Sequence, residues 1–228
     1  MKKNETSVQT VKENNQASVP VIKRLPRYHR YLEELNNSGV VRISSKELAN
    51  KMGVTASQIR QDFNCFGGFG LQGYGYNVKQ LHEEIGKILG LDNKKNAIMI
   101  GAGNLGRAIA SHLKFENRGF NLVGIFDNDP HIIGSYIGDR RVKDIAAIED
   151  FIKEKKPEVA ILCIPTEFVE ETATKLISLG IRGFWNFTHY DLLRKFDNIA
   201  VENVHLGDSL MTLCYQINTL QDTSEANQ

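Results

Sequence analysis

The glycine-rich segment IGAGNLGRAIASHL, at residues 100–113, is the feature that most constrains the fold of this chain. It follows the apolar run NAIMI and continues with the apolar spacing of a helix. Glycines at 101, 103 and 106 fit a tight turn that joins a buried parallel strand to the helix behind it. The flanking strand and helix patterns, more than the glycines alone, predict the first strand–turn–helix unit of a doubly wound sheet.

Strand and helix patterns keep alternating after this segment. We predict strands in FNLVGIFD, EVAILCIP, IRGFWNF and IAVENV, and helices in DIAAIEDFIKEK and TEFVEETATKLISLG. This alternation predicts an α/β fold, a Rossmann-type doubly wound parallel sheet over residues 91–204. A last helix is expected over 205–221, because apolar residues recur there every three or four positions. The polar tails, 1–19 and 222–228, are expected to be disordered.

The glycine loop has the pattern of a dinucleotide site. Gly101 permits the turn, Gly103 lets the backbone approach a pyrophosphate, and Gly106 lets helix and strand pack closely. Asp127 ends the second strand, where a carboxylate accepts hydrogen bonds from the adenosine ribose. A role as a helix cap or loop residue is the alternative for Asp127. Asp129 lies close by with no basic residue between, which favours NAD(H) over NADP(H).

Loops that follow later strands are expected to line the nicotinamide end of the same crevice. The complete set of predicted cofactor contacts is Gly101, Ala102, Gly103, Asn104, Leu105, Gly106, Asp127, Asn128, Ile164, Pro165, Thr166, Asn186, Phe187 and Thr188.

Residues 20–90 predict a second domain, a winged helix-turn-helix. A helix is expected over Tyr28–Asn37. Two short helices then begin at capping boxes, Ser44 with Glu47 and Thr55 with Gln58, around the turn MGVT. The segment GGFGLQGYGYNV interleaves glycines with aromatic residues and predicts the hairpin of a wing. An amphipathic helix, VKQLHEEIGKIL, closes the domain; a generic helical pair is the alternative interpretation.

Charge separates the two predicted domains. Residues 1–90 hold 13 Lys and Arg against 8 Asp and Glu, net +5, and residues 91–228 hold 15 against 19, net −4. A basic module that meets DNA, joined to an acidic ligand-binding module, has this distribution. The predicted DNA contacts are Lys46, Ser57, Gln58, Arg60, Gln61, Gln72, Gly73 and Tyr74.

Several functional classes are disfavoured by what the sequence lacks. No apolar run is long enough to cross a membrane, and three cysteines without metal-ligand spacing suggest a reduced, cytoplasmic protein without a metal. A nicotinamide dehydrogenase needs a proton donor beside the hydride path. No Tyr-x-x-x-Lys motif occurs, and His189 and His205 have no obvious substrate clamp around them. We therefore expect no enzymatic activity.

The segments RLPRYHRYLEEL, RISSKELANKMGVTASQIRQDF, FGGFGLQGYGYNV, IGAGNLGRAIA, GIFDNDP, GIRGFWNF and VENVHLGDSL follow one another as in the Rex family of redox-sensing transcriptional repressors. The resemblance runs from about Ile22 to Leu220. It implies a homodimer with an exchanged C-terminal helix, which releases its DNA when NADH rises. The dimer symmetry predicts a palindromic operator. An NAD-dependent oxidoreductase and a CoA-binding protein remain the alternatives.

The chain departs from the commonest pattern of that family at four positions. Gln61 and Gln72 stand where many members have a basic residue, which bears on the preferred operator bases. His205 stands where some members have an Asp before the exchanged helix, and His112 replaces the Tyr that pairs with it. A hydrogen-bond switch built from that pair must work differently here.

Overall fold

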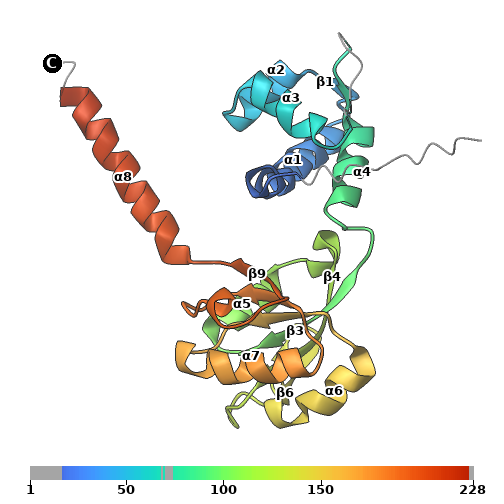
Figure 1. Ribbon diagram of the computed structural model, residues 1–228, viewed down its shortest axis with the longest axis vertical. Coiled ribbons are helices and arrows are strands. Elements are labelled where there is room, and N and C mark those ends of the chain that lie inside the picture. Colours follow the sequence, from blue (N-terminus) through green and yellow to red (C-terminus); the bar gives the residue numbers. More distant parts are fainter. Residues whose placement is uncertain (1–16, 68, 70–73, 226–228) are drawn as a thin grey trace, which may run out of the picture. The chain divides into compact units, whose positions relative to one another are not determined.

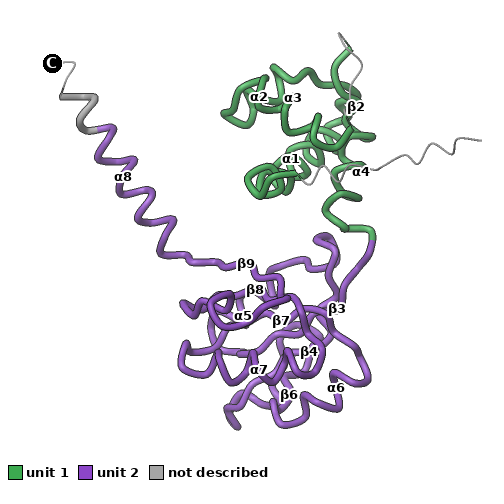
Figure 2. Tube along the Cα trace, in the orientation of Figure 1, with its two compact units in different colours: residues 1–92 green, residues 93–228 purple. Residues whose placement is uncertain are grey.

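The computed structural model describes residues 17–67, 69 and 74–225 of the 228-residue chain. The chain divides into two compact units, 1–92 and 93–228 (Figure 2). Unit 1 contains the predicted winged helix-turn-helix, and unit 2 contains the glycine loop and all that follows it. Most of the predicted tail, residues 1–16, lies outside the described residues.

Unit 1 is built from helices and a short two-stranded ribbon (Figure 1). Its elements are α1 (Val19–Asn37), β1 (Arg42–Ile43), α2 (Ser45–Met52), α3 (Ala56–Asn64), β2 (Tyr76–Asn77) and α4 (Val78–Ile88). The predicted start of α1, at Tyr28, is wrong, because the helix already begins at Val19 and contains Pro26. Its buried stripe explains this, since tertiary packing on both sides of Pro26 outweighs the proline penalty. The stripe consists of Val21, Leu25, Tyr28, Leu32 and Leu35.

The two short helices α2 and α3 begin as the sequence predicts. The first capping box is complete: the Ser44 side chain accepts from the Glu47 N–H, and the Glu47 carboxylate accepts from the Ser44 N–H. The second is only half formed. Thr55 Oγ1 accepts from the Gln58 N–H at 3.1 Å, but the Gln58 side chain turns away from the Thr55 backbone.

The base of the predicted wing is present. β1 and β2 pair antiparallel, with Arg42 opposite Asn77 and Ile43 opposite Tyr76. Gly75 enters β2 with a φ of 68°, and a Cβ there would lie 2.7 Å from the Ile43 carbonyl oxygen, so only glycine fits. The tip of the wing, residues 68 and 70–73, lies outside the described residues.

Unit 2 contains a seven-stranded sheet in the order β5-β6-β4-β3-β7-β8-β9. All neighbouring strands are parallel except β5, which runs antiparallel to β6 at one edge. The strands are β3 (Lys95–Ile100), β4 (Phe120–Asp127), β5 (Tyr136–Ile137), β6 (Arg140–Asp144), β7 (Val159–Leu162), β8 (Gly183–Asn186) and β9 (Ala200–Asn203). The parallel core agrees with the predicted doubly wound sheet.

The sequence did not predict β5 and β6. β6 has the sequence RRVKD, in which only Val142 is buried, so no alternating apolar pattern marks it as a strand. The predicted helix DIAAIEDFIKEK is correspondingly shorter. Asp144 belongs to β6, a 3-10 turn covers Ile145–Ala147, and helix α6 begins only at Ile148.

Helices cover both faces of the sheet. α6 (Ile148–Lys155) and α7 (Val169–Ser178) pack on the face that receives Ile98 and Ile100 of β3. α5 (Asn104–His112) packs on the face that receives Ala97 and Met99. Alternate residues of one buried strand thus enter two separate cores, as a doubly wound sheet requires.

The last helix, α8 (Leu206–Glu225), exposes its large apolar side chains within the single chain. Leu206, Leu210 and Leu220 are 61%, 68% and 71% exposed. The helix also extends past the predicted end at 221, so the expected disorder is wrong for residues 222–225, whose backbone is helical. Residues 226–228 lie outside the described residues. Within the described part of the chain, no helix is both long and apolar enough to cross a membrane.

Candidate dinucleotide pocket and DNA-reading helix

The glycine loop brings strand β3, helix α5 and the end of β7 into contact. Gly101 has a φ of 96°, and a Cβ there would lie 2.3 Å from the Cys163 carbonyl oxygen. A Cβ on Gly106 would lie 2.1 Å from the Gly101 carbonyl oxygen. Both positions therefore require glycine for reasons internal to the fold, before any ligand is considered.

Gly103 is different, because nothing lies within 4 Å of the place where its Cβ would be. Its φ of −67° is one that any residue adopts. The residue precedes α5 as its N-cap, has no side chain to cap the helix, and lines a cavity. The first N–H groups of α5 are thus left for an anion such as a pyrophosphate. No internal contact within 4 Å accounts for glycine here, whereas a closely approaching ligand would.

Asp127 ends β4 beside this loop. Its Oδ2 accepts a hydrogen bond from the Ala102 N–H at 2.7 Å, and its Oδ1 accepts from the Asp129 N–H at 2.9 Å. A carboxylate has about four acceptor positions, so two remain for ribose hydroxyls. Asp127 thus has the alternative role of a loop residue, because its carboxylate holds the Ala102 and Asp129 backbone, and it also lines the cavity.

The cavity has a volume of about 450 Å³ and lies at the carboxyl ends of β3, β4 and β7. Ligands of doubly wound sheets bind at this edge. Six predicted contacts line it: Gly101, Gly103, Asp127, Asn128, Ile164 and Pro165. The sequence missed ten further lining residues, namely Ile100, Ile145, Ala146, Ile148, Cys163, Phe168, Glu171, Thr172, Lys175 and Leu176. All of them except Ile100, which ends β3, follow β6 or β7 in the chain, and the carboxyl end of β7 was the signal for those on α7.

Three predicted residues at the end of β8 do not reach the cavity. Asn186 is fully buried, and its amide donates to the Tyr190 carbonyl and to Asn203 Oδ1. Its Oδ1 accepts from the N–H and the hydroxyl of Thr188. Phe187 packs edge-to-face on Trp185, with ring centroids 4.6 Å apart. Asn186 and Thr188 therefore use their polar atoms to hold the loop itself.

The remaining predicted loop residues surround the cavity without lining it. Ala102 is buried and contributes its N–H to Asp127, and Gly106 is buried beneath the loop. Asn104 and Leu105 form the exposed first turn of α5. Thr166 opens the short 3-10 turn Thr166–Phe168 after Pro165.

The two histidines that the sequence offered as proton donors, His189 and His205, do not line the cavity. Burial raises the pKa of the Cys163 thiol to about 12, so it stays protonated at neutral pH. The rings of His189 and His205 lie 5.4 Å apart. Among the described residues, no group of three or more His, Cys, Asp and Glu side chains is placed to hold a metal.

In unit 1, helix α3 presents one face to solvent. Ser57, Arg60 and Gln61 are exposed, and Arg60 donates to Ser45 Oγ at 3.1 Å. Lys46 is exposed at the start of α2, and Tyr74 at the base of the wing is 71% exposed. The predicted contacts Gln72 and Gly73 lie outside the described residues.

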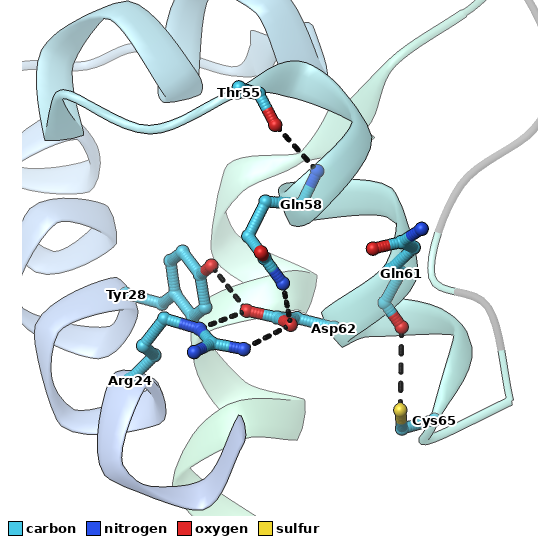
Figure 3. A network of polar contacts seen from close by, with 7 residues as sticks. All are labelled: Arg24, Tyr28, Thr55, Gln58, Gln61, Asp62 and Cys65. Carbon is cyan, nitrogen blue, oxygen red and sulfur yellow. Dashed lines mark hydrogen bonds and ion pairs between the residues drawn. The ribbon is translucent and has the colours of Figure 1, made fainter. Parts of the chain in front are cut away.

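Gln58 is placed differently from the prediction. Its amide donates to Asp62 Oδ1 at 2.8 Å, on the side of α3 that faces α1 (Figure 3). Asp62 is 1% exposed and also accepts from Arg24 and Tyr28. Burial opposes the ionisation of Asp62, but these hydrogen bonds outweigh it and hold the pKa of the carboxyl below its usual range. Gln58 therefore belongs to an internal network and is not free to read bases.

Both units match known families. A family model described as "Putative DNA-binding protein N-terminus" matches residues 17–64, and one described as "CoA binding domain" matches residues 92–190. The "Redox-sensing transcriptional repressor Rex" of Thermoanaerobacter sp. (strain X514) is 57% identical over 201 residues, 88% of this chain and 89% of that protein. The protein of the same name from Clostridium perfringens (strain SM101) is 53% identical over 88% of this chain and 94% of its own. The chain belongs to the Rex family.

Solved structures of a Rex-family repressor, RSP, share this architecture. RSP in complex with β-NAD+ and operator DNA is 54% identical, with a TM-score of 0.83 over 93% of this chain and 97% of that one. RSP in complex with β-NADH is 52% identical, with a TM-score of 0.83 over 92% and 98%. The predicted combination of a DNA-binding domain and a Rossmann-type domain is confirmed, and the two alternative functions are not favoured.

The loop geometry predicts opposite outcomes for two glycines. Gly103→Ala should leave the free energy of unfolding near the wild-type value, because its Cβ meets open space. NAD(H) affinity should fall at least tenfold, since the methyl group takes space that a pyrophosphate needs, and a tenfold loss is about 1.4 kcal/mol. Gly106→Ala should instead destabilise unit 2 by about 1–3 kcal/mol through overpacking. Urea unfolding and NADH fluorescence titration measure the two effects. Wild-type NADH affinity in Gly103→Ala would refute the assignment.

Proposed function

We propose that this chain is a transcriptional repressor that senses the NADH/NAD+ ratio: it binds operator DNA through unit 1 and releases it when NADH occupies unit 2. The observation that carries this proposal is a glycine loop whose Gly103 faces a cavity instead of the fold, on a chain that also presents a capped helix-turn-helix. Its Rex-family relatives carry the name of redox-sensing repressors.

We propose that α3 enters the major groove with Ser57, Arg60 and Gln61 nearest the bases. A glutamine amide bridges an adenine edge with two hydrogen bonds, whereas Arg and Lys favour guanine. Lys46 and the wing residues Gly73 and Tyr74 contact the phosphate backbone. Arg42 donates to the Tyr74 carbonyl oxygen at 3.2 Å, which supports a defined position for the wing base.

In unit 2, the N-terminus of α5 and Gly103 hold the pyrophosphate, and Asp127 holds the adenosine ribose. When bound, the dinucleotide supplies the redox signal through the charge of its nicotinamide ring. Lys175 is the cationic side chain among the cavity-lining residues, and it pairs with Glu149 at 3.0 Å. The pairing leaves little positive potential for a 2′-phosphate, which supports NAD(H) over NADP(H).

Discrimination between NADH and NAD+ has to come from the nicotinamide end of the cofactor. A contact made equally with both forms does not change the difference between their binding free energies. Ile164 and Pro165 are apolar lining residues at that end, and Glu171, the acidic lining residue that follows them, is exposed to solvent. Burying the cationic ring of NAD+ against such a surface is costly, while the neutral ring of NADH gains from burial. We therefore propose that NADH binds more tightly than NAD+. Phe187, which we expected in the same lining, packs on Trp185 instead.

We further propose that the protein works as a homodimer in the cytoplasm. The exposed leucines of α8 need a partner surface, and a helix exchanged between two copies supplies one. Unit 2 offers an apolar hollow of about 490 Å³, lined by Phe115, Ile161, Trp185 and Val201 among others. The two-fold symmetry of such a dimer requires a palindromic operator.

The function is tested by titrating a protein–operator complex separately with NADH and NAD+. We expect NADH to dissociate the complex at a concentration at least tenfold lower, which corresponds to only about 1.4 kcal/mol of differential binding. Electrophoretic mobility shift or fluorescence anisotropy on a palindromic duplex gives the midpoints. Dissociation by NAD+ at the lower concentration would overturn the proposed direction of the signal.

Base reading is tested by a pair of substitutions on adjacent helices. Gln61→Lys should change the preferred base at one position in each half-site, because it replaces an amide by a cation. Lys46→Ala should weaken binding to all sequences alike and reduce the salt slope by about one. Affinities for a panel of single-base operator variants at several salt concentrations separate these effects. An equal loss on every sequence for Gln61→Lys would contradict its position beside the bases.

The role of α8 is tested by charging its apolar surface. The double variant Leu210→Glu with Ile217→Glu should fold, because both side chains are exposed within the chain, at 68% and 46%. It should lose the dimer, since two carboxylates then enter an apolar interface. Gln216→Glu on the same helix is the matched control. Analytical ultracentrifugation gives the mass, and a dimer that survives the double substitution argues against α8 as the dimerisation helix.

A further inference from the structure

Helix α3 buries a carboxylate on the face turned away from its exposed residues. Asp62 is 1% exposed and is the only charged residue among the fully buried side chains of the described chain. It lies between Ile59 and Phe63, which are 0% and 1% exposed. An apolar residue at this position would serve packing alone, so the acid calls for another explanation.

Every acceptor position of this carboxylate is used (Figure 3). Asp62 Oδ2 accepts from Arg24 Nε at 2.7 Å and from the Tyr28 hydroxyl at 2.6 Å. Oδ1 accepts from Arg24 Nη2 at 2.7 Å and from Gln58 Nε2 at 2.8 Å. The contact with Arg24 is bidentate, the geometry that fixes orientation as well as distance.

The donors come from two different helices. Arg24 and Tyr28 lie one turn apart on α1, and Gln58 lies one turn before Asp62 on α3. Apolar contacts such as those of Phe63 tolerate small rotations of a helix about its axis. A planar guanidinium paired with a planar carboxylate does not, because both hydrogen bonds are lost together. The network therefore fixes the rotation of α3 against α1.

The same network decides which α3 residues face outward. It draws the amide of Gln58 inward, although Gln58 follows Ser57 in the first turn of the helix. Ser57, Arg60 and Gln61 remain exposed. A rotation of α3 would replace this set by another, so the identity of the reading face depends on a carboxylate that is itself inaccessible.

We propose that Asp62 and Arg24 are positioning residues for sequence discrimination: they hold α3 in the rotation at which its exposed residues match the operator, without contacting DNA. This inference rests on the proposed function, in which α3 reads the bases. The competing role for Arg24, whose side chain is 30% exposed, is a direct phosphate contact. The two roles differ in what they do to non-specific binding, because a phosphate contact strengthens binding to every sequence.

The test compares affinities for the operator and for a scrambled duplex of equal length, across a salt series, in the full-length protein. We expect Asp62→Asn and Arg24→Met each to lower the operator affinity tenfold to a hundredfold. Affinity for the scrambled duplex should stay within about twofold, and the salt slope should not change, since no phosphate contact is lost. Glu83→Gln, an exposed acid-to-amide change on α4, is the matched control and should change neither affinity.

Loss of folding is separated from loss of position by neutralising both partners. Arg24→Met with Asp62→Asn leaves neither partner charged, so it removes the unpaired buried carboxylate of Arg24→Met and the unpaired guanidinium of Asp62→Asn. The double variant should fold, as judged by circular dichroism and an unchanged NADH affinity, and still lack the operator preference. A double variant that folds and regains wild-type preference would overturn the positioning role.

Two further outcomes are decisive. A uniform loss on both duplexes with a smaller salt slope in Arg24→Met would make Arg24 a phosphate contact and overturn the inference, with the proposed function intact. A wild-type protein that binds both duplexes equally would overturn the proposed function and the inference together.

Discussion

The contact between Gly106 and the Gly101 carbonyl is the constraint on which the cofactor cavity depends. A Cβ at residue 106 would lie 2.1 Å from that oxygen, so α5 can approach the end of β3 only because no side chain intervenes. The approach places the N-terminus of α5 over the carboxyl edge of the sheet, where β4 and β7 also end. Asp127 then reaches the Ala102 N–H, and Gly103 is left facing open space. Close packing of Gly106 thus leaves the N-terminus of α5 open at Gly103, where we propose that the pyrophosphate binds.

The two units position their functional groups by opposite means. Unit 2 excludes side chains, because its loop must let the backbone of a helix N-terminus meet a ligand. Unit 1 buries a charged group, because a nine-residue helix has too few apolar residues to define its rotation. A buried carboxylate stabilises only if its hydrogen bonds are complete, and those of Asp62 are. In the proposed role, the Asp62 carboxylate fixes the rotation of α3 more than it adds to the free energy of unfolding.

Most of the architecture could be predicted from the sequence, because local patterns mark it: the capping box of Ser44, the glycines of the loop, and the buried strands. What could not be predicted depends on contacts between distant segments. Nothing in the sequence RRVKD identifies β6, since it pairs with β4 through its backbone and buries one residue. Gln58 fitted a capping box, but Asp62 offers its amide a charged acceptor in place of the helix backbone. A charged residue on the apolar stripe of α3 was the available signal.

The lining of the cavity could also be predicted only where local sequence patterns mark it. The glycines of the loop and the acid at the end of β4 indicate part of the lining. Glu171 and Lys175 reach the cavity from α7 only because that helix packs on the sheet, which no local pattern predicts. Asn186 and Thr188 had the right place in the sequence. Their polar atoms, however, are consumed within the loop and by Asn203 of β9. A position at the end of a parallel strand is therefore necessary for a ligand contact but does not ensure one.

Coupling between the two units needs an element whose free energy differs between the DNA-bound and released states, since a ligand shifts an equilibrium only by its differential affinity. α8 is a described helix whose large apolar side chains are exposed within the single chain, and it begins directly after His205. His205 Nδ1 lies 3.5 Å from Asp208 Oδ2, and its ring centroid lies 5.4 Å from that of His189, so its neighbours come from the start of α8 and from the loop after β8. The acid–tyrosine pair that the family resemblance implies is absent, with His205 and His112 in its place. In the proposed homodimer, the burial of α8, rather than one polar contact before it, is the free-energy term that we expect NADH binding to alter.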